Sequence, residues 1–219
     1  MKVLKLELFQ ETACYKKPFA FKVGETYPLP PFSTVKGMFH NILDAEEFIP
    51  MQISIQGNYE SKFVDYQTMY FQKKKETTKM PLNMHLLYNV ELVIHIKAED
   101  KVIDDIVEGI KNSDEYLSLG RKEDLVRIDE IKFVDLKQQE IKPLKNSYVI
   151  DQPIYIPTKN KYAEQIHGIN YRLNWKYEII EGLRQWEKID AKYVEKGEQI
   201  TNGTVTLDED NDLVCFNLQ

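Results

Sequence analysis

The sequence predicts an α+β protein that begins with a ferredoxin-like βαββαβ domain. Apolar residues alternate with polar ones over four stretches, as in half-buried strands, and recur every three or four residues over two others, as in amphipathic helices. Along the chain these stretches come in the order strand, helix, strand, strand, helix, strand. That order packs two helices on one face of a four-stranded antiparallel sheet.

The strands and helices of this predicted domain all fall within residues 1–140. Alternation places the strands at 2–10, 51–60, 88–97 and 127–137. The helical patterns lie at 33–46 and 100–113. The first helix follows a proline-rich turn that fixes the backbone in extended geometry, and Ser33 is then predicted to be its N-cap.

An insert at about 61–87 separates the second and third predicted strands, where a hairpin needs only a few residues. It combines aromatic residues with lysines: Tyr66, Tyr70, Phe71, Lys73, Lys74, Lys75 and Lys79. Aromatic rings can stack on nucleic-acid bases while lysines neutralise phosphates. A solvated excursion with a few tyrosines packed on its base explains the same composition equally well, so both interpretations stand.

Residues 141–219 are predicted to form a β-rich extension packed on the first domain, because helical periodicity fades and no glycine/serine linker divides the two parts. The stretch Glu178–Asp212 holds ten acidic and four basic residues, which accounts for the whole formal net charge of −6. The rest of the chain is balanced and carries local basic clusters. We expect the acidic stretch to face solvent or a basic neighbouring protein rather than a polyanion.

The composition is that of an ordinary globular protein, with 42% hydrophobic and 29% charged residues. No apolar run is long enough to cross a bilayer, and the first residues alternate charge with hydrophobe, so neither a membrane span nor a signal peptide is expected. Cys14 and Cys215 are the only cysteines, which argues against a disulfide framework. We therefore expect a cytoplasmic protein.

Motifs for cofactor and metal chemistry are missing from the sequence. It contains no glycine-rich phosphate loop, no His-Glu-x-x-His and no Cys-x-x-Cys, so no cofactor and no metal are expected. A general base for RNA cleavage would need a residue such as Tyr27, Lys36 or His40, which lie near the first helix. A histidine on a helix surface remains the simpler interpretation of His40.

A second motif, Gly120-Arg121-Lys122, follows the second predicted helix. Gly120 can adopt backbone conformations closed to other residues, so a phosphate could approach the main chain there, and Arg121 could bind it through two hydrogen bonds. Glu123 and Asp124 weaken this interpretation unless they point away. A helix C-cap glycine beside basic residues is the alternative.

Two runs together resemble the Cas-five family, the CRISPR-associated RAMP-superfamily subunits of type I Cascade complexes: YPLPPFSTVKGMFHNIL from Tyr27 and LGRKEDLV from Leu119. The resemblance covers most of the first 140 residues, and the length and style of the sequence are most similar to the type I-B branch. It implies a ferredoxin-like (RRM/RAMP) domain with a long thumb between its second and third strands, where the insert lies.

The resemblance also implies a function. Such subunits bind the 5′ handle of the CRISPR RNA (crRNA) and cap the Cascade complex in antiviral defence, beside a backbone RAMP subunit, the large subunit and target DNA near the protospacer-adjacent motif. We accordingly expect these RNA-binding residues: Ser33, Thr34, Lys36, Tyr70, Lys73, Lys74, Lys75, Lys79, Gly120, Arg121 and Lys122.

The alternative is a metal-independent endoribonuclease that processes precursor crRNA. One branch of the family, type I-C, cuts RNA with a tyrosine, a lysine and a histidine. That set cannot be placed residue by residue in this sequence, where Tyr27, Lys36 and His40 are its candidates. We therefore expect a protein that binds RNA without cutting it.

Overall fold

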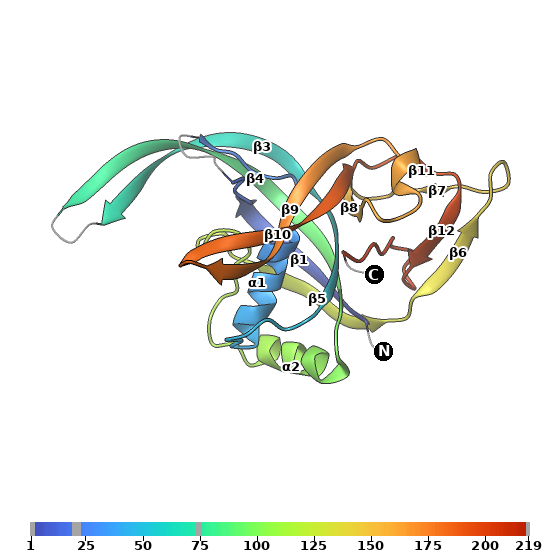
Figure 1. Cartoon of the computed structure of the whole chain (residues 1–219), viewed down its shortest axis with the longest axis horizontal. Helices are drawn as coiled ribbons and strands as arrows, with labels where there is room; N and C mark the ends of the chain where they lie inside the picture. Colours follow the sequence, from blue (N-terminus) through green and yellow to red (C-terminus); the bar gives the residue numbers. More distant parts are fainter. Residues whose placement is uncertain (1–2, 19–22, 73–75, 218–219) are drawn as a thin grey trace.

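The chain folds into a mostly antiparallel sheet with two helices, which confirms the predicted α+β class (Figure 1). The computed structural model describes residues 3–18, 23–72 and 76–217. The strands of its large sheet are β1 (Val3–Ala13), β2 (Val23–Gly24), β3 (Gln52–Gln72), β4 (Thr77–Lys97), β5 (Arg127–Val134), β8 (Ile154–Pro157), β9 (Ile169–Ile180) and β10 (Leu183–Val194). They are ordered β5-β1-β4-β3-β8-β10-β9, and β2 pairs with β4 beside this path.

The two helices, α1 (Phe32–Ile42) and α2 (Asp100–Lys111), pack against one face of the strands. They share a core with alternate residues of β1 and β4: Val35, Phe39, Ile103, Ile106, Leu4, Leu6, Ile94 and Ile96. Burial of these apolar faces, rather than local propensity, is what stabilises helices of this length. Each strand and helix predicted within residues 1–140 overlaps one of these elements.

The predicted N-cap of the first helix is wrong by two residues. Pro31 occupies that position with φ −59° and ψ 152°, and no side chain caps the helix. Its carbonyl accepts hydrogen bonds from the backbone N–H groups of Thr34 and Val35 at 2.9 and 3.2 Å. Because the proline turn already sets the extended conformation that an N-cap needs, Ser33 falls inside the first helical turn.

Strands β3 and β4 run on past the body of the protein as a curved two-stranded arm (Figure 1). The arm comprises residues 61–72 and 76–87, so the predicted insert is the outer part of one long hairpin rather than a separate excursion. One side of it is buried near its base, where Leu82, Met84 and Leu86 pack with Cys14. The parallel strand β2 pairs with β4 at this point, which brings Gly24 directly against Met84.

The residues after 140 extend the large sheet. β8 joins β3 through the pair Gln56 and Ile154, and the β9–β10 hairpin follows. Two small sheets pair β6 (Lys137–Ile141) with β12 (Gly203–Leu207) and β7 (Tyr148–Val149) with β11 (Gln199–Ile200). Together with the short 3-10 helix Ala163–Gln165, they enclose a second hydrophobic core.

Candidate nucleic-acid interface

The two sequence motifs meet at one hollow of about 860 Å³, which we call the α1 cleft. Ser33 and Thr34 line it from the first turn of α1, and Gly120 and Lys122 line it from the loop at 114–125. Tyr116, which is 88% exposed, and Trp186 of β10 add aromatic side chains. The cleft therefore combines hydroxyl groups, a lysine and aromatic rings in one place, and the acidic residues Asp114 and Glu115 line it as well.

The buried carboxylate of Asp124 gives the loop beside the cleft its shape. It accepts hydrogen bonds from the backbone N–H groups of Cys14 and Arg121 at 3.0 and 2.9 Å. Gly120 takes φ +117° next to it, a conformation that favours glycine. A side chain at this position would also lie 2.8 Å from the Asp124 carboxylate. The Asp124 carboxylate thus ties the loop to Cys14, the residue after β1, and the Gln10 side chain of β1 holds it further by donating to the Leu119 and Asp124 carbonyls.

Arg121 was predicted to bind phosphate, and its guanidinium has protein partners in the structure. It donates to Asp124 at 2.7 Å and to Gln67 of the arm at 3.0 Å, and it forms an ion pair with Glu123 at 3.0 Å. Burial alone would lower the pKa of Arg121, but the hydrogen bond and charge of Asp124 raise it above its usual value. Arg121 therefore links the loop to the arm, and Lys122 is the cation of this motif that lines the cleft.

Lys36 is buried between two aromatic rings. Its ammonium lies 4.8 Å from the ring centre of Phe48 and 5.0 Å from that of Trp175. Burial, with a smaller contribution from the charge of Lys176, lowers the pKa of Lys36. Phe48 and Trp175 thus cover the side chain of Lys36, which was expected to bind RNA.

The candidates for a ribonuclease site are divided between two places. His40 also contacts Phe48, with ring centres 6.1 Å apart, and burial lowers the pKa of its imidazole. Tyr27 contacts a different aromatic residue, Tyr171, and lines a separate hollow. Lys36 and His40 therefore share one aromatic surface, whereas Tyr27 belongs to another.

The exposed face of the arm carries aromatic rings. Tyr66 and Tyr70 lie on the same face of β3 and are 72% and 57% exposed. The Lys79 ammonium lies 5.1 Å from the centre of the Tyr70 ring, directly across the hairpin. Lys73, Lys74 and Lys75 lie outside the described residues. The described part of the arm thus carries exposed aromatic rings together with two lysines, Lys79 and Lys62.

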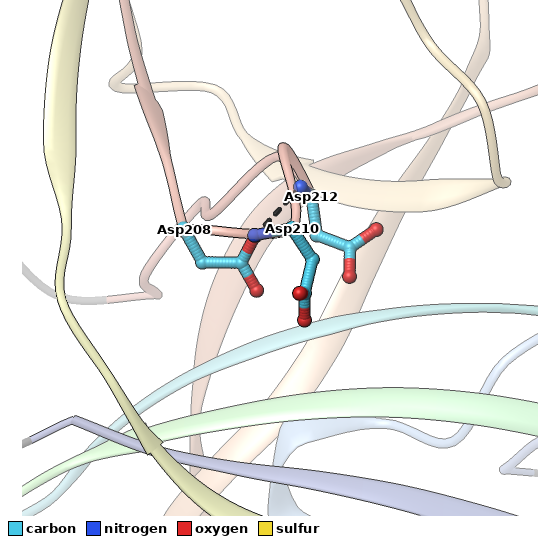
Figure 2. Close-up of side chains that lie close together, drawn as sticks. All are labelled: Asp208, Asp210 and Asp212. Atoms are coloured by element: carbon cyan, nitrogen blue, oxygen red, sulfur yellow. Dashed lines mark hydrogen bonds between the residues drawn. The ribbon is translucent and has the colours of Figure 1, made fainter.

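Part of the acidic stretch Glu178–Asp212 is buried, whereas all of it was predicted to face solvent or a neighbouring protein. Asp208 is fully buried, and its carboxylate accepts hydrogen bonds from the backbone N–H groups of Asp210 and Asp212 (Figure 2). The Lys5 ammonium lies 3.2, 2.7 and 2.5 Å from Asp208, Asp210 and Asp212. These three aspartates could hold a cation, and the cation that they surround is Lys5. The prediction that this stretch faces solvent or a neighbour is therefore wrong for Asp208.

Sequence reasoning missed Tyr116 and Trp186 in the α1 cleft. Tyr116 adjoins the second motif and could have been found as an aromatic residue beside a basic loop. Trp186 carries no such signal, because it reaches the cleft only through the pairing of β10 with β8 and of β8 with β3.

The comparisons with known proteins identify the family. The family model described as CRISPR-associated protein (Cas_Cas5) matches residues 3–201. The chain belongs to this CRISPR-associated family. No curated protein matches the sequence. Asp208, Asp210 and Asp212 lie beyond the matched residues.

Solved structures with a similar fold are also CRISPR proteins. A chain from a "CRISPR RNA-guided surveillance complex" aligns with a TM-score of 0.63 at 12% identity, covering 92% of each chain. A "CRISPR protein from Archaeoglobus fulgidus" aligns with a TM-score of 0.55 at 9% identity, covering 99% of each chain. At these identities the likeness concerns the fold. Among the described residues, neither helix has the length and apolar character of a membrane span.

Proposed function

We propose that the chain is a subunit of a Cascade-type CRISPR surveillance complex and binds the 5′ handle of the crRNA without cutting it. The observation that carries this proposal is the α1 cleft, which gathers Ser33, Thr34 and Lys122 beside Tyr116 and Trp186. Hydroxyl groups and lysines bind phosphates, and aromatic rings stack on unpaired bases. Family membership and the fold shared with a chain of an RNA-guided complex support the same function.

The proposed fold is a ferredoxin-like core with a thumb and a β-rich extension. The strand order β5-β1-β4-β3, with α1 after β1 and α2 after β4, supports a βαββαβ domain at residues 1–140. The arm at 61–87 is then the thumb, whose tyrosines stack on RNA while Lys73, Lys74, Lys75 and Lys79 neutralise phosphates. Residues 141–219 form the β-rich extension.

We also propose a subtype, a cellular compartment and binding partners for the chain. The type I-B branch is the proposed subtype, and the cytoplasm is the proposed compartment. A backbone RAMP subunit and the large subunit are the proposed protein partners, with target DNA near the protospacer-adjacent motif as a further contact. Co-purification of a tagged chain with a short RNA and neighbouring CRISPR proteins tests these partners together.

A binding assay with a charge-reversal variant tests the cleft. Lys122→Glu is expected to weaken binding of a fluorescent CRISPR-repeat RNA and to reduce the slope of log K against log salt concentration by about 0.7, as for one lost phosphate contact on a single strand. Lys145→Glu reverses an exposed lysine away from the cleft and serves as the matched control. Equal affinity and equal salt slopes for both variants would remove the cleft from the proposal.

Metal-independent cleavage is the weaker alternative, because Tyr27 lines a different hollow from the surface shared by Lys36 and His40. We expect repeat RNA to stay intact when incubated with the protein in EDTA. Site-specific cutting that His40→Ala abolishes would overturn the non-catalytic part of the proposal.

A further inference from the structure

A second hollow, of about 170 Å³, lies where the arm joins the body, and four tyrosines line it. They come from four separate segments: Tyr27 from the proline turn, Tyr59 from β3, Tyr171 from β9 and Tyr193 from β10. We call this hollow the tyrosine cup. Tyr27 and Tyr171 meet edge to face, with ring centres 5.3 Å apart. The cup is thus a built aromatic site rather than a chance gap between loops.

The rim of the cup is polar and carries charges of both signs. Lys17 and Lys62 line it together with Glu195. The Lys17 ammonium lies 5.9 and 6.0 Å from the ring centres of Tyr27 and Tyr171. Glu195 lines the cup together with Tyr59 and Tyr193, and burial, followed by the charge of Glu195, raises the pKa of both phenols.

Size and charge together restrict what the cup can hold. Its volume is well below the roughly 300–1,000 Å³ of pockets for drug-sized ligands, so it suits one flat ring system. Aromatic walls offer stacking and edge contacts to such a ring. Lys17, Lys62 and Glu195 line the cup, and Lys17 also forms an ion pair with Glu25 at 3.3 Å, so it is chiefly Lys62 that favours a ligand with negative charge beside its ring. A nucleotide combines these properties.

The carboxylate narrows the choice of base. Glu195 can only accept hydrogen bonds when ionised, and its two oxygens match two adjacent N–H donors. Guanine presents such a pair on its Watson–Crick edge, the ring N1–H and the exocyclic amino group, whereas adenine, cytosine and uracil present a donor next to an acceptor. We propose that the tyrosine cup binds one unstacked guanine of an RNA strand, with Glu195 accepting from that edge and Lys17 and Lys62 beside the phosphates.

The cup is connected to the α1 cleft by a short rigid segment. Tyr27 and Pro28 line the cup, and Ser33 and Thr34 line the cleft. Between them, the Tyr155 hydroxyl donates a hydrogen bond to the Leu29 carbonyl at 2.8 Å and fixes the segment to β8. Six or seven residues span at most about 25 Å, so one strand of RNA can reach both hollows. The guanine site therefore rests on the proposed RNA-binding function and adds sequence selectivity to it.

The test uses the full chain and twelve-nucleotide uridine RNAs that carry guanosine, inosine or adenosine at one central position. Fluorescence anisotropy is expected to give about tenfold tighter binding for guanosine than for adenosine, with inosine between them because it lacks the exocyclic amino group. Glu195→Gln is expected to reduce the guanosine preference below about twofold while all-uridine RNA binds as before. Glu164→Gln, an exposed glutamate outside the cup, is the matched control.

A guanosine preference that is absent, or that Glu195→Gln leaves unchanged, overturns the guanine site. If none of the RNAs binds, the proposed RNA-binding function fails. A second measurement then tests whether the cup binds guanine by itself. Guanosine monophosphate is then titrated against adenosine monophosphate while tyrosine ring signals are followed by NMR. Shifts that require guanosine and disappear in Glu195→Gln support the cup, and equal or absent shifts contradict it. Both variants change exposed side chains, so folding is expected to be retained.

Discussion

The Lys5 ammonium on β1 lies 2.7 Å from the carboxylate of Asp210, 205 residues further along the chain. Lys5 is almost fully buried, and Asp208 and Asp212 complete its surroundings. This cluster covers the face of β1 opposite the helices and joins the first strand to the end of the chain. A buried ammonium is tolerated only with such paired carboxylates, so each partner depends on the other.

Replacing Lys5 is expected to lower the free energy of unfolding more than breaking any single surface ion pair would. Lys5→Met removes the cation and leaves three carboxylates close together, and we expect the free energy of unfolding to fall by about 3–5 kcal/mol. Urea denaturation followed by circular dichroism measures this change. Lys142→Met breaks an exposed pair with Glu140 and should cost less than about 1 kcal/mol. Equal losses for the two variants would show that the cluster contributes little.

The same cluster predicts a dependence of stability on pH. Burial raises the pKa of Asp208, but hydrogen bonds from His95, the Asp212 backbone and Lys5 outweigh it and lower the pKa to about 2. Because the unfolded value is about 3.9, the contribution of Asp208 is complete above about pH 5 and is lost as the pH falls through 4 towards 2.

Unfolding measured across this range should therefore depend less on pH in Asp208→Asn than in the unchanged protein. Glu47→Gln, which alters an exposed carboxyl group, should keep the full dependence. If the free energy of unfolding depended on pH as strongly in Asp208→Asn as in the unchanged protein, Asp208 would not be the source of the acid sensitivity.

The exposed rings of the arm are expected to contribute to RNA binding. Tyr70→Leu removes a stacking surface worth about 1–3 kcal/mol, so the Kd for single-stranded RNA should rise at least about fivefold. Fluorescence anisotropy with a labelled RNA measures it. Phe133→Leu changes an exposed ring on the edge strand β5 and should leave the Kd unchanged. The same loss in both variants would indicate a nonspecific effect.

Gly120 is expected to be the less replaceable of two glycines beside the α1 cleft. Gly120→Ala forces a side chain into φ +117° and to within 2.8 Å of the Asp124 carboxylate, so it should destabilise the protein by about 1–3 kcal/mol. Gly37→Ala places a methyl group on α1 with nothing within 4 Å and should be neutral or stabilising by up to about 1 kcal/mol. Thermal unfolding of both variants compares them, and a neutral Gly120→Ala would disprove the strain.

The order of strands and helices could be predicted from the sequence because periodic burial is a local property. The cleft could be predicted in part: Ser33 and Lys122 belong to motifs that stand out along the chain, and the structure places both at one hollow. The burial of Lys36 could not be foreseen, because the ring that covers it, Trp175, arrives with the β9–β10 hairpin.

The tyrosine cup could not be predicted from the sequence either, because its residues come together only when distant strands pair. Tyr171 and Tyr193 look like ordinary strand residues, and they approach Tyr27 only when β8 joins β3 and draws β10 and β9 after it. The partners of Lys5 were also hidden, since an acidic run at the end of a chain is typical of a solvated surface.

Photo-crosslinking shows directly whether RNA occupies the α1 cleft. Repeat RNA containing 4-thiouridine is bound to the full chain and irradiated, and the crosslinked peptides are identified by mass spectrometry. We expect crosslinks in the peptides that contain Tyr116 and Trp186, and we expect these crosslinks to be lost when Lys122→Glu weakens binding. RNA that binds but crosslinks only outside the α1 cleft, for instance at Asp208–Asp212, would contradict this expectation.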